Sequence, residues 1–305
     1  MKIDPAASLS DKSAPTVAII IASLGRPDIL GELLDDLANQ SRPADRIILS
    51  VTCKADLPPD AAARPTVETI IGPIGSCVQR NRGIDHIGDR CDILFFCDDD
   101  YVPSRFAIER IAALFGANPN LAGTTGHLLA DGVNSPGIGA QEARVMLDDY
   151  DRRPAAPSTV YRDLAGLYGC NMAFRSLAIK DVRFDERLRL YGWQEDIDFS
   201  VRIRPRGRIA KSFAFAGVHR GVKAGRSRGV RIGYSQVVNP AYLVRKGTMD
   251  WRYACNIVLR NFFANHLRSL GAEPWVDRIG RVRGNWIGVG DVLRGRLTPE
   301  RVESL

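Results

Sequence analysis

Short apolar runs of strand length alternate with segments of helical periodicity through the first 115 residues. The opening run, residues 16–22 (TVAIIIA), is continuous and rich in β-branched residues, as in a strand buried on both faces of a parallel sheet. The predicted strands are residues 16–22, 46–51, 67–71 and 91–97, and the predicted helices are residues 28–39, 75–87 and 103–115. This alternation predicts an α/β fold whose parallel sheet is wound with helices.

The pattern weakens after residue 130. Residues 131–165 are rich in Gly, Pro, Ser and Asp, which predicts a long excursion over the surface or a lid. The sequence then predicts a strand at residues 166–175, a helix at residues 193–204 and several helices within residues 240–305. We therefore expect the C-terminal part of the chain to be helical.

Charge is divided unevenly along the chain, whose net charge is +7. Residues 202–305 contain 21 Lys and Arg against 6 Asp and Glu, whereas residues 1–201 contain 21 against 29. An acidic first part suits a metal site, and a basic last third suits phosphates, an anionic membrane surface or an acidic polymer. The alternative for the last third is a solvated basic surface.

The sequence shows no targeting or membrane-spanning segment. Its first residues, MKIDPAASLSDKSAP, lack an apolar core of signal-peptide length, and no later run approaches the roughly 20 apolar residues of a spanning helix. The six cysteines have no metal-binding spacing, so we interpret them as reduced core thiols. These features predict a cytoplasmic protein.

Three adjacent aspartates, Asp98, Asp99 and Asp100, follow the apolar strand of residues 91–97 (CDILFFC). Ligands bind at the carboxyl ends of strands in sheets of this kind. Adjacent like charges cost free energy unless a cation or ordered hydrogen-bond donors compensate them. Mg²⁺ and Mn²⁺ prefer carboxylate and phosphate oxygens, so Asp98 and Asp100 are predicted to contact a metal and a ribose together. The alternative is a solvated acidic turn.

A second acidic group, Glu195 and Asp196, follows Gly192, Trp193 and Gln194 and begins an amphipathic segment. Two acids at the start of a helix are often only partners of the helix dipole, and this alternative stays open. A sugar hydroxyl that attacks an anomeric carbon needs a carboxylate to take its proton, and the ring of Trp193 offers a face for a pyranose. One acidic group for a metal and one for a base supply both halves of a glycosyl transfer.

Five segments carry these features in one order: IIIASLGRPDILGELLDDLANQSRPADRIIL, GSCVQRNRGI, FFCDDD, GCNMAFR and GWQEDIDFSVRIRPRG. In this order and spacing they resemble glycosyltransferase family 2, the inverting enzymes with the GT-A fold, of the bacterial polysaccharide type. The resemblance covers most of the chain. It implies a flexible leader at residues 1–14, a GT-A catalytic domain at residues 15–235 and a helical extension at residues 236–305. Within that domain, residues 15–125 would bind the nucleotide sugar and residues 126–235 the acceptor.

The resemblance also implies roles on the donor side. Asp100 would coordinate a Mg²⁺ or Mn²⁺ ion that bridges the donor phosphates, and Asp98 would contact the ribose or the metal. His219 falls where many members place a histidine that completes the metal coordination. Arg80 would lie near the nucleobase or the diphosphate. The residues implied to bind the nucleotide sugar are Arg26, Arg80, Asn81, Asp98 and Asp99.

On the acceptor side, the resemblance implies that Asp196 is the catalytic base. Glu195 would orient Asp196 or bind acceptor hydroxyls. Trp193 and Gln194 would contact the acceptor sugar.

The segment after the second predicted strand departs from the family pattern. Family members usually have an aspartate there that contacts uracil, but this chain reads SVTCKAD, with Val51 or Thr52 near that position. Asp56 would replace it only in a rearranged loop, and Ser50 or Thr52 would offer a hydroxyl instead. From the resemblance we still expect a UDP-linked donor.

The sequence therefore predicts an inverting hexosyltransferase that moves a sugar from a UDP-sugar to a hydroxyl of a glycan or lipid-linked saccharide. The alternatives are a metal-dependent sugar nucleotidyltransferase and a non-catalytic glycan-binding module. Nucleic acid is not an expected partner, because no nucleic-acid motif accompanies the basic last third. Arg and bulky apolar residues are mixed in NIVLRNFFANHLRSL and RGNWIGVGDVLRGRL, which predicts either packing on the core or docking on the inner face of the cell membrane.

Overall fold

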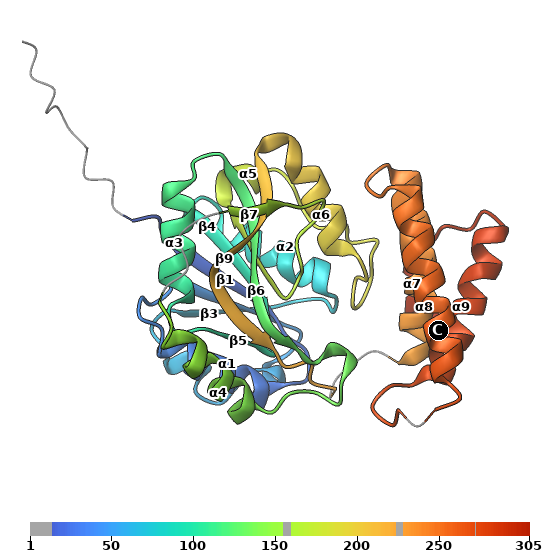
Figure 1. Cartoon of the computed structure of the whole chain (residues 1–305), viewed down its shortest axis with the longest axis horizontal. Helices are drawn as coiled ribbons and strands as arrows, with labels where there is room; N and C mark the ends of the chain where they lie inside the picture. Colours follow the sequence, from blue (N-terminus) through green and yellow to red (C-terminus); the bar gives the residue numbers. More distant parts are fainter. Residues whose placement is uncertain (1–13, 155–159, 224–227, 272) are drawn as a thin grey trace, which may run out of the picture.

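The computed structural model describes residues 14–154, 160–223, 228–271 and 273–305. Figure 1 shows a curled sheet covered by helices, beside a group of helices at the C-terminus. The predicted flexible leader, residues 1–14, lies outside the described residues except for residue 14.

The first half of the sheet consists of parallel strands in the order β3–β2–β1–β4. These strands and the helices that accompany them are β1 (Val17–Ala22), α1 (Pro27–Ala38), β2 (Arg46–Val51), β3 (Val67–Ile71), α2 (Ser76–Ile87), β4 (Ile93–Asp98) and α3 (Ala107–Ala117). Residues 17–21 of β1 are fully buried, because a central parallel strand is covered on both faces. The predicted α/β fold with a mostly parallel sheet wound with helices is confirmed.

The second half of the sheet contains antiparallel pairings and two long strands that the sequence did not predict, β6 and β9. The order continues from β4 through β8, β6 and β9 to β5, and β7 pairs with β9. These strands are β5 (Tyr101–Pro103), β6 (Leu121–Asp131), β7 (Val160–Asp163), β8 (Asn171–Arg175) and β9 (Arg208–His219). The parallel pair of β6 and β9 has three register shifts, which interrupt the period-two pattern expected of a strand. Gly123 and Gly126 also interrupt β6, because aromatic rings of neighbouring strands occupy the space beside them.

The stretch predicted as a surface excursion or a lid, residues 131–165, contains regular elements that the sequence did not predict. This stretch contains α4 (Ala140–Asp151) and β7. Ala143 and Leu147 of α4 pack with Val102 and Val218 of the sheet. These are the only residues of α4 that are buried, so its apolar stripe is too short to be recognised in the sequence. Residues 155–159 lie outside the described residues.

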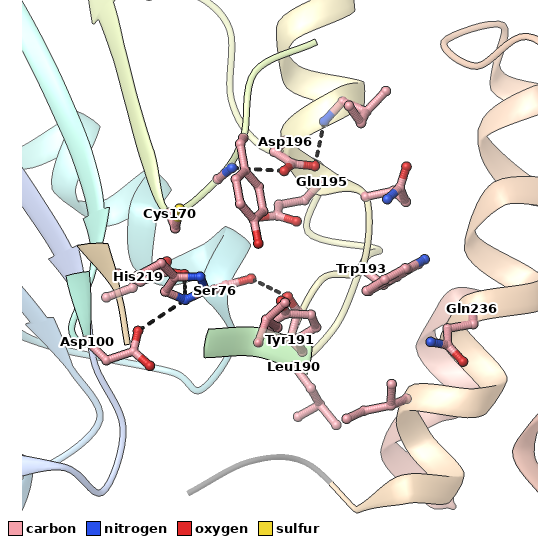
Figure 2. A pocket seen from close by; sticks show the side chains of 18 of the residues that line it. Ser76, Asp100, Cys170, Leu190, Tyr191, Trp193, Glu195, Asp196, His219 and Gln236 are labelled. Atoms are coloured by element: carbon pink, nitrogen blue, oxygen red, sulfur yellow. Dashed lines mark hydrogen bonds and ion pairs between the residues drawn. The ribbon is translucent and has the colours of Figure 1, made fainter. Parts of the chain in front are cut away.

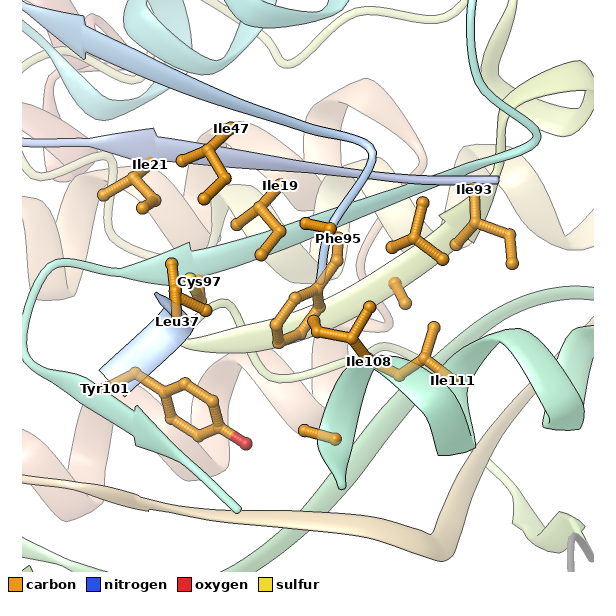
Figure 3. Close-up of a cluster of buried hydrophobic side chains, with 14 of the residues drawn as sticks. Ile19, Ile21, Leu37, Ile47, Ile93, Phe95, Cys97, Tyr101, Ile108 and Ile111 are labelled. Atoms are coloured by element: carbon orange, nitrogen blue, oxygen red, sulfur yellow. The ribbon is translucent and has the colours of Figure 1, made fainter. Parts of the chain in front are cut away.

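Two apolar clusters occupy the two faces of the sheet. Phe95 and Phe96 of β4 point to opposite faces, because successive side chains of a strand alternate. Phe95 packs in the cluster that includes Leu37 of α1 and Ile108 of α3 (Figure 3). Phe96 belongs to the other cluster, which extends to Leu243 in the C-terminal helices. This second cluster joins those helices to the sheet.

The C-terminal group consists, in the described part of the chain, of α7 (Gly229–Lys246), α8 (Trp251–Arg268) and α9 (Arg278–Leu293). The backbones of α7 and α9 approach closely at Gly233 and Gly284, where an added Cβ would lie 2.1 and 2.0 Å from a carbonyl oxygen of the other helix. The boundary predicted between residues 235 and 236 falls inside α7, and the division into domains stays a prediction. Among the described residues, no helix combines the length and apolar character needed to cross a membrane.

Shorter elements connect the larger ones. They are α5 (Ser176–Ile179), α6 (Glu195–Ile203) and 3-10 turns at Lys54–Asp56, Ala61–Ala63, Gly132–Asn134, Arg204–Arg206 and Pro299–Ser304. The six cysteines are free thiols, but the expectation that they belong to the core is wrong for Cys53 and Cys255, which are exposed.

Gly284→Ala is expected to destabilise the fold, because its methyl group would collide with the carbonyl oxygen of Val230 in α7. Overpacking of this kind typically costs about 1–3 kcal/mol. The matched control is Gly290→Ala in the same helix, where the methyl group would meet only the flexible end of Arg294. Urea unfolding should show a lower free energy of unfolding for Gly284→Ala and no loss for the control. Equal stabilities would contradict the close approach of α7 and α9.

Candidate active site

A cleft of about 1150 Å³ lies between the sheet and the C-terminal helices. Its lining includes the carboxyl ends of β1 and β4, the loop before α6, and residues of α7, α8 and α9. Figure 2 shows Asp100 and His219 on the sheet side, Asp196 at the start of α6 and Gln236 on α7. Ligands of open α/β sheets bind at this position, outside the carboxyl ends of the strands.

The middle aspartate of the acidic run, Asp99, bonds to the loop that follows β1. It accepts hydrogen bonds from Ser23 Oγ at 2.7 Å and from Arg26 Nη1 at 2.8 Å. Burial raises the pKa of Asp99 to about 6, although the charge of Arg26 opposes this shift. The same Nη1 atom lies 3.9 Å from Asp100 Oδ2. Asp99 thus fixes Arg26 at the edge of the cleft.

His219, at the end of β9, lies between two carboxylates. Its Nε2 atom is 3.3 Å from Asp100 Oδ1 and 3.8 Å from Asp98 Oδ2. Its Nδ1 atom bonds to Asp131 Oδ1 at 2.9 Å, and the Tyr168 hydroxyl donates to the other oxygen of Asp131 at 2.9 Å. Burial opposes protonation of His219, but its bonds to Asp100 and Asp131 raise its pKa to about 10. Burial likewise opposes ionisation of Asp100, but the bond with His219 lowers its pKa to about 2.

Asp98, Asp100 and His219 have the geometry and chemistry of a divalent metal site. One ligand atom from each lies within 4.8 Å of the other two. The carboxylates suit Mg²⁺ and Mn²⁺ alike, and the imidazole adds a preference for a transition metal, which favours Mn²⁺ of the two. The bond to Asp131 holds the ring so that Nε2 faces the two carboxylates, as the outer partners of metal-binding histidines do. These three residues could therefore hold such an ion.

Arg80 of α2 is buried between the two acidic groups that the sequence singled out. Its Nη2 atom donates to Asp98 Oδ1 at 3.0 Å and to the carbonyl oxygen of Gly169 at 3.2 Å, and Nη1 donates to Glu195 Oε1. Burial opposes its charge, but Glu195 and Asp98 raise the pKa of Arg80 further. The guanidinium therefore links the possible metal ligands to the acids of α6.

Glu195 and Asp196 have different surroundings at the start of α6. Glu195 is buried and paired with Arg80, whereas Asp196 keeps partial exposure. Asp196 Oδ2 accepts from the amide of Gly169 at 2.9 Å, and Oδ1 accepts from the amide of Ile197 at 2.8 Å. Burial raises the pKa of both carboxyl groups. Asp196 is the member of the pair that is more accessible to a ligand in the cleft.

The loop before α6 holds two non-glycine residues in left-handed conformations, Leu190 with φ 57° and Gln194 with φ 72°. This conformation costs free energy, and Ser76 supports it by donating to the carbonyl oxygens of Leu190 at 2.8 Å and Tyr191 at 3.1 Å. The indole nitrogen of Trp193 and the amide oxygen of Gln194 are buried without a hydrogen-bond partner in the part of the chain that is described. Both residues line the cleft, where a ligand or water would satisfy these atoms.

Two other residues considered in the sequence do not line the cleft. Asn81 donates from Nδ2 to the carbonyl oxygen of Phe184 at 2.9 Å and accepts from the amide of Phe184 at 2.7 Å, so its side chain holds that segment against α2. Asp56 is buried and accepts hydrogen bonds from the amides of Gly25 and Thr52 and from the Thr52 hydroxyl. The structure therefore brings together Asp98, Asp100, His219, Arg26, Arg80, Glu195 and Asp196 around the cleft, but not Asn81.

Sequence reasoning missed Asp131, Tyr168 and Gly169. Asp131 ends the unpredicted strand β6, so nothing indicated that it would lie beside His219. Gly169 was included in a predicted strand, yet its backbone binds both Arg80 and Asp196 in the turn before β8. The one available signal was the pair of glycines in GLYGCN, which is typical of a close backbone approach.

The chain matches no protein-family model and no curated protein sequence. It is similar to solved structures over nearly its whole length. S. aureus TarS matches with 15% identity and a TM-score of 0.51, over 95% of this chain and 50% of TarS. TarS 1–349 in complex with UDP-GlcNAc matches with 14% identity and a TM-score of 0.53, over 95% of this chain and 83% of that one.

GalNAc-T7 with UDP, GalNAc and Mn²⁺ is also similar, with 14% identity and a TM-score of 0.55, over 94% of this chain and 60% of that chain. The chain thus spans half the length of the full TarS chain and under two thirds of GalNAc-T7. At these identities the likeness shows the fold, which is the GT-A fold of glycosyltransferases.

Arg80→Met is expected to lower the free energy of unfolding by about 3–5 kcal/mol, because Asp98 and Glu195 would be left without their shared cation. The double variant Arg80→Met/Glu195→Gln should lose less than the sum of the single losses, since it removes one of the unpaired charges. The control is Arg82→Met on the same helix. It removes an exposed hydrogen bond to Ile71 and should change the free energy of unfolding by less than about 0.5 kcal/mol. Additive losses in urea unfolding would contradict the coupling of Arg80 to Glu195.

Proposed function

We propose that the chain is a metal-assisted, inverting glycosyltransferase of family 2, which moves a sugar from a UDP-sugar to a hydroxyl of a glycan or lipid-linked saccharide. The observation that carries the proposal is that Asp98, Asp100 and His219, which could hold a metal, share one cleft with the accessible carboxylate of Asp196. The GT-A fold supports it, as do neighbours solved with UDP-GlcNAc or with UDP and Mn²⁺.

On the donor side, Mg²⁺ or Mn²⁺ held by Asp98, Asp100 and His219 would supply positive charge to the diphosphate leaving group. Arg26, fixed by Asp99, adds a cation at the edge of the same site. Asp56 accepts hydrogen bonds from Gly25 and Thr52 and does not line the cleft, so we do not assign it the contact with uracil. The preference for UDP therefore rests on the neighbours and on the sequence resemblance.

On the acceptor side, Asp196 acts as the general base. The amides of Gly169 and Ile197 hold its carboxylate in one orientation, and burial raises its pKa, which strengthens it as a proton acceptor. Glu195, paired with Arg80, positions the start of α6. The deprotonated hydroxyl attacks the anomeric carbon opposite the diphosphate, so a single displacement inverts the configuration there.

Asp100→Ala should abolish transfer and weaken the Mn²⁺-dependent part of UDP binding, because the site would lose one of its two carboxylate ligands. Asp89→Ala, which removes an exposed carboxylate paired with Lys180, is the control and should bind UDP normally. Calorimetric titration with UDP and Mn²⁺ measures the difference. Unchanged affinity in Asp100→Ala would exclude this metal site.

Asp196→Asn should keep UDP affinity but reduce transfer by at least about 10²-fold, the low end for loss of a general base. The assay follows nucleoside diphosphate release from a UDP-sugar with an acceptor glycan. Release of pyrophosphate from a sugar phosphate and UTP would indicate a nucleotidyltransferase instead. Transfer at the wild-type rate in Asp196→Asn would place the base elsewhere, with Glu195 as the next residue to test.

We also propose that α8 docks the protein on an anionic membrane, at the inner face of the cell membrane. Leu259, Phe263 and Leu267 form a ridge at helical spacing of four, with exposed fractions of 54%, 59% and 72%. Arg252 is exposed on the same helix and does not line the cleft. Each arginine near an anionic surface contributes roughly 1 kcal/mol, in addition to burial of the apolar ridge.

Flotation with liposomes tests this docking. The protein should float with phosphatidylglycerol vesicles at low salt and be released by high salt. It should not bind neutral phosphatidylcholine vesicles. Phe263→Ser/Leu267→Ser should reduce flotation, whereas Leu177→Ser, which removes a leucine with 75% exposure on α5, should not. Absence of flotation with both vesicle types would contradict the proposal that the ridge docks on a membrane.

A further inference from the structure

The two walls of the cleft differ in their charged residues. The sheet side and the start of α6 contribute both acids and cations, among them Arg26, Arg80 and Lys211. Every acidic residue among the described lining residues belongs to the sheet side or to the start of α6. The wall formed by residue 228 and the helices after it contributes no acid to the described lining and six arginines: Arg228, Arg231, Arg260, Arg268, Arg278 and Arg281. Such a wall attracts an anion into the cleft.

Arg228 and Arg260 are exposed, and their side chains have no hydrogen bond or ion pair with the residues that the structure describes. Others are engaged: Arg278 bonds to Glu273 at 2.6 Å, and Arg231 bonds to the carbonyl oxygen of Leu305 at 2.9 Å. Arg228 and Arg260 therefore keep their donors for a ligand. A guanidinium binds carboxylate or phosphate with two parallel hydrogen bonds.

Arg260 lies on the side of α8 that faces the acids of α6. Tyr253, two turns before it on the same helix face, also lines the cleft. Burial and the charge of Asp196 raise the pKa of Tyr253, and Arg260 opposes the shift, so this phenol lies within the electrostatic reach of both groups. The arginine wall therefore faces the side of the cleft where the base lies.

The donor diphosphate does not account for these arginines. Its counter-charges lie on the opposite wall, where Arg26 and the possible metal ligands are grouped at the ends of β1 and β4. We therefore expect the arginines of the helical wall to contact the acceptor.

Resting on the glycosyltransferase function proposed above, we infer that the acceptor is anionic, carrying phosphate or carboxylate groups that bind Arg228 and Arg260 while its hydroxyl is presented to Asp196. This goes beyond a glycan acceptor of unspecified charge. It also gives the basic last third of the chain a role inside the cleft, separate from any role at a membrane.

Three soluble oligomers of similar length test the inference: oligogalacturonate, its neutral methyl ester, and a glycerol phosphate oligomer. Calorimetry measures their binding with and without Mn²⁺ and UDP. Wild-type protein should bind the carboxylate or the phosphate oligomer at least about 10-fold more tightly than the methyl ester, and the stronger of the two identifies the anion. Arg228→Gln/Arg260→Gln should lose at least about 10-fold of that affinity.

The matched control is Arg252→Gln/Arg283→Gln, which removes the same charge from exposed positions of α8 and α9 that do not line the cleft. An equal loss of oligomer affinity in this control would show that the effect depends only on total charge, and it would overturn the inference. The inference would also be overturned if the methyl ester bound as tightly as the anionic oligomers, or if neither anionic oligomer bound. A loss of UDP affinity in Arg228→Gln/Arg260→Gln would overturn it too, because these arginines would then serve the donor. Failure of the proposed function is separate, because it would appear as absence of Mn²⁺-dependent UDP binding in the wild-type protein.

Discussion

The ion pairs of Arg80 connect the two halves of the candidate site. A carboxylate near the end of a β-strand and another at the start of a helix would repel each other in a buried setting, yet Asp98 and Glu195 both bond to one guanidinium. The carbonyl oxygen of Gly169 takes a further bond from Arg80, while the amide of Gly169 holds Asp196. The spacing between the possible metal ligands and Asp196 is thus fixed by the hydrogen bonds and ion pairs of Arg80 and Gly169, so the geometry of each side depends on the other.

Much of the sheet was predictable because its first half follows simple periodic rules. The runs TVAIIIA and CDILFFC are apolar at every position where a doubly covered strand requires it, and the aspartates that follow the second run lie at the cleft as expected. The same reasoning failed for β6 and β9, where register shifts and glycines under aromatic rings remove the periodic signal. Because β6 was not predicted, Asp131 at its end was not predicted either, although it orients His219.

The roles expected of single side chains were predictable only where the chemistry is local. Asp98 and Asp100 are two residues apart, so their proximity follows from the chain itself. Arg80 and Glu195 are 115 residues apart, and only the fold shows that this arginine is shared by two acids. The same holds for Asn81, whose amide is used to hold Phe184 and does not reach the cleft. Pairings at such sequence separation leave no pattern in a single sequence.

In the proposed function, Asp98, Asp100 and His219 hold a divalent cation against a nucleoside diphosphate. Crystals grown with MnCl₂ and UDP, measured at the manganese absorption edge, test it most directly. We expect one anomalous peak within coordination distance of Asp100 and His219, with the diphosphate of UDP bound to the same ion. UDP bound elsewhere, or bound in the cleft with no manganese beside these residues, would contradict it.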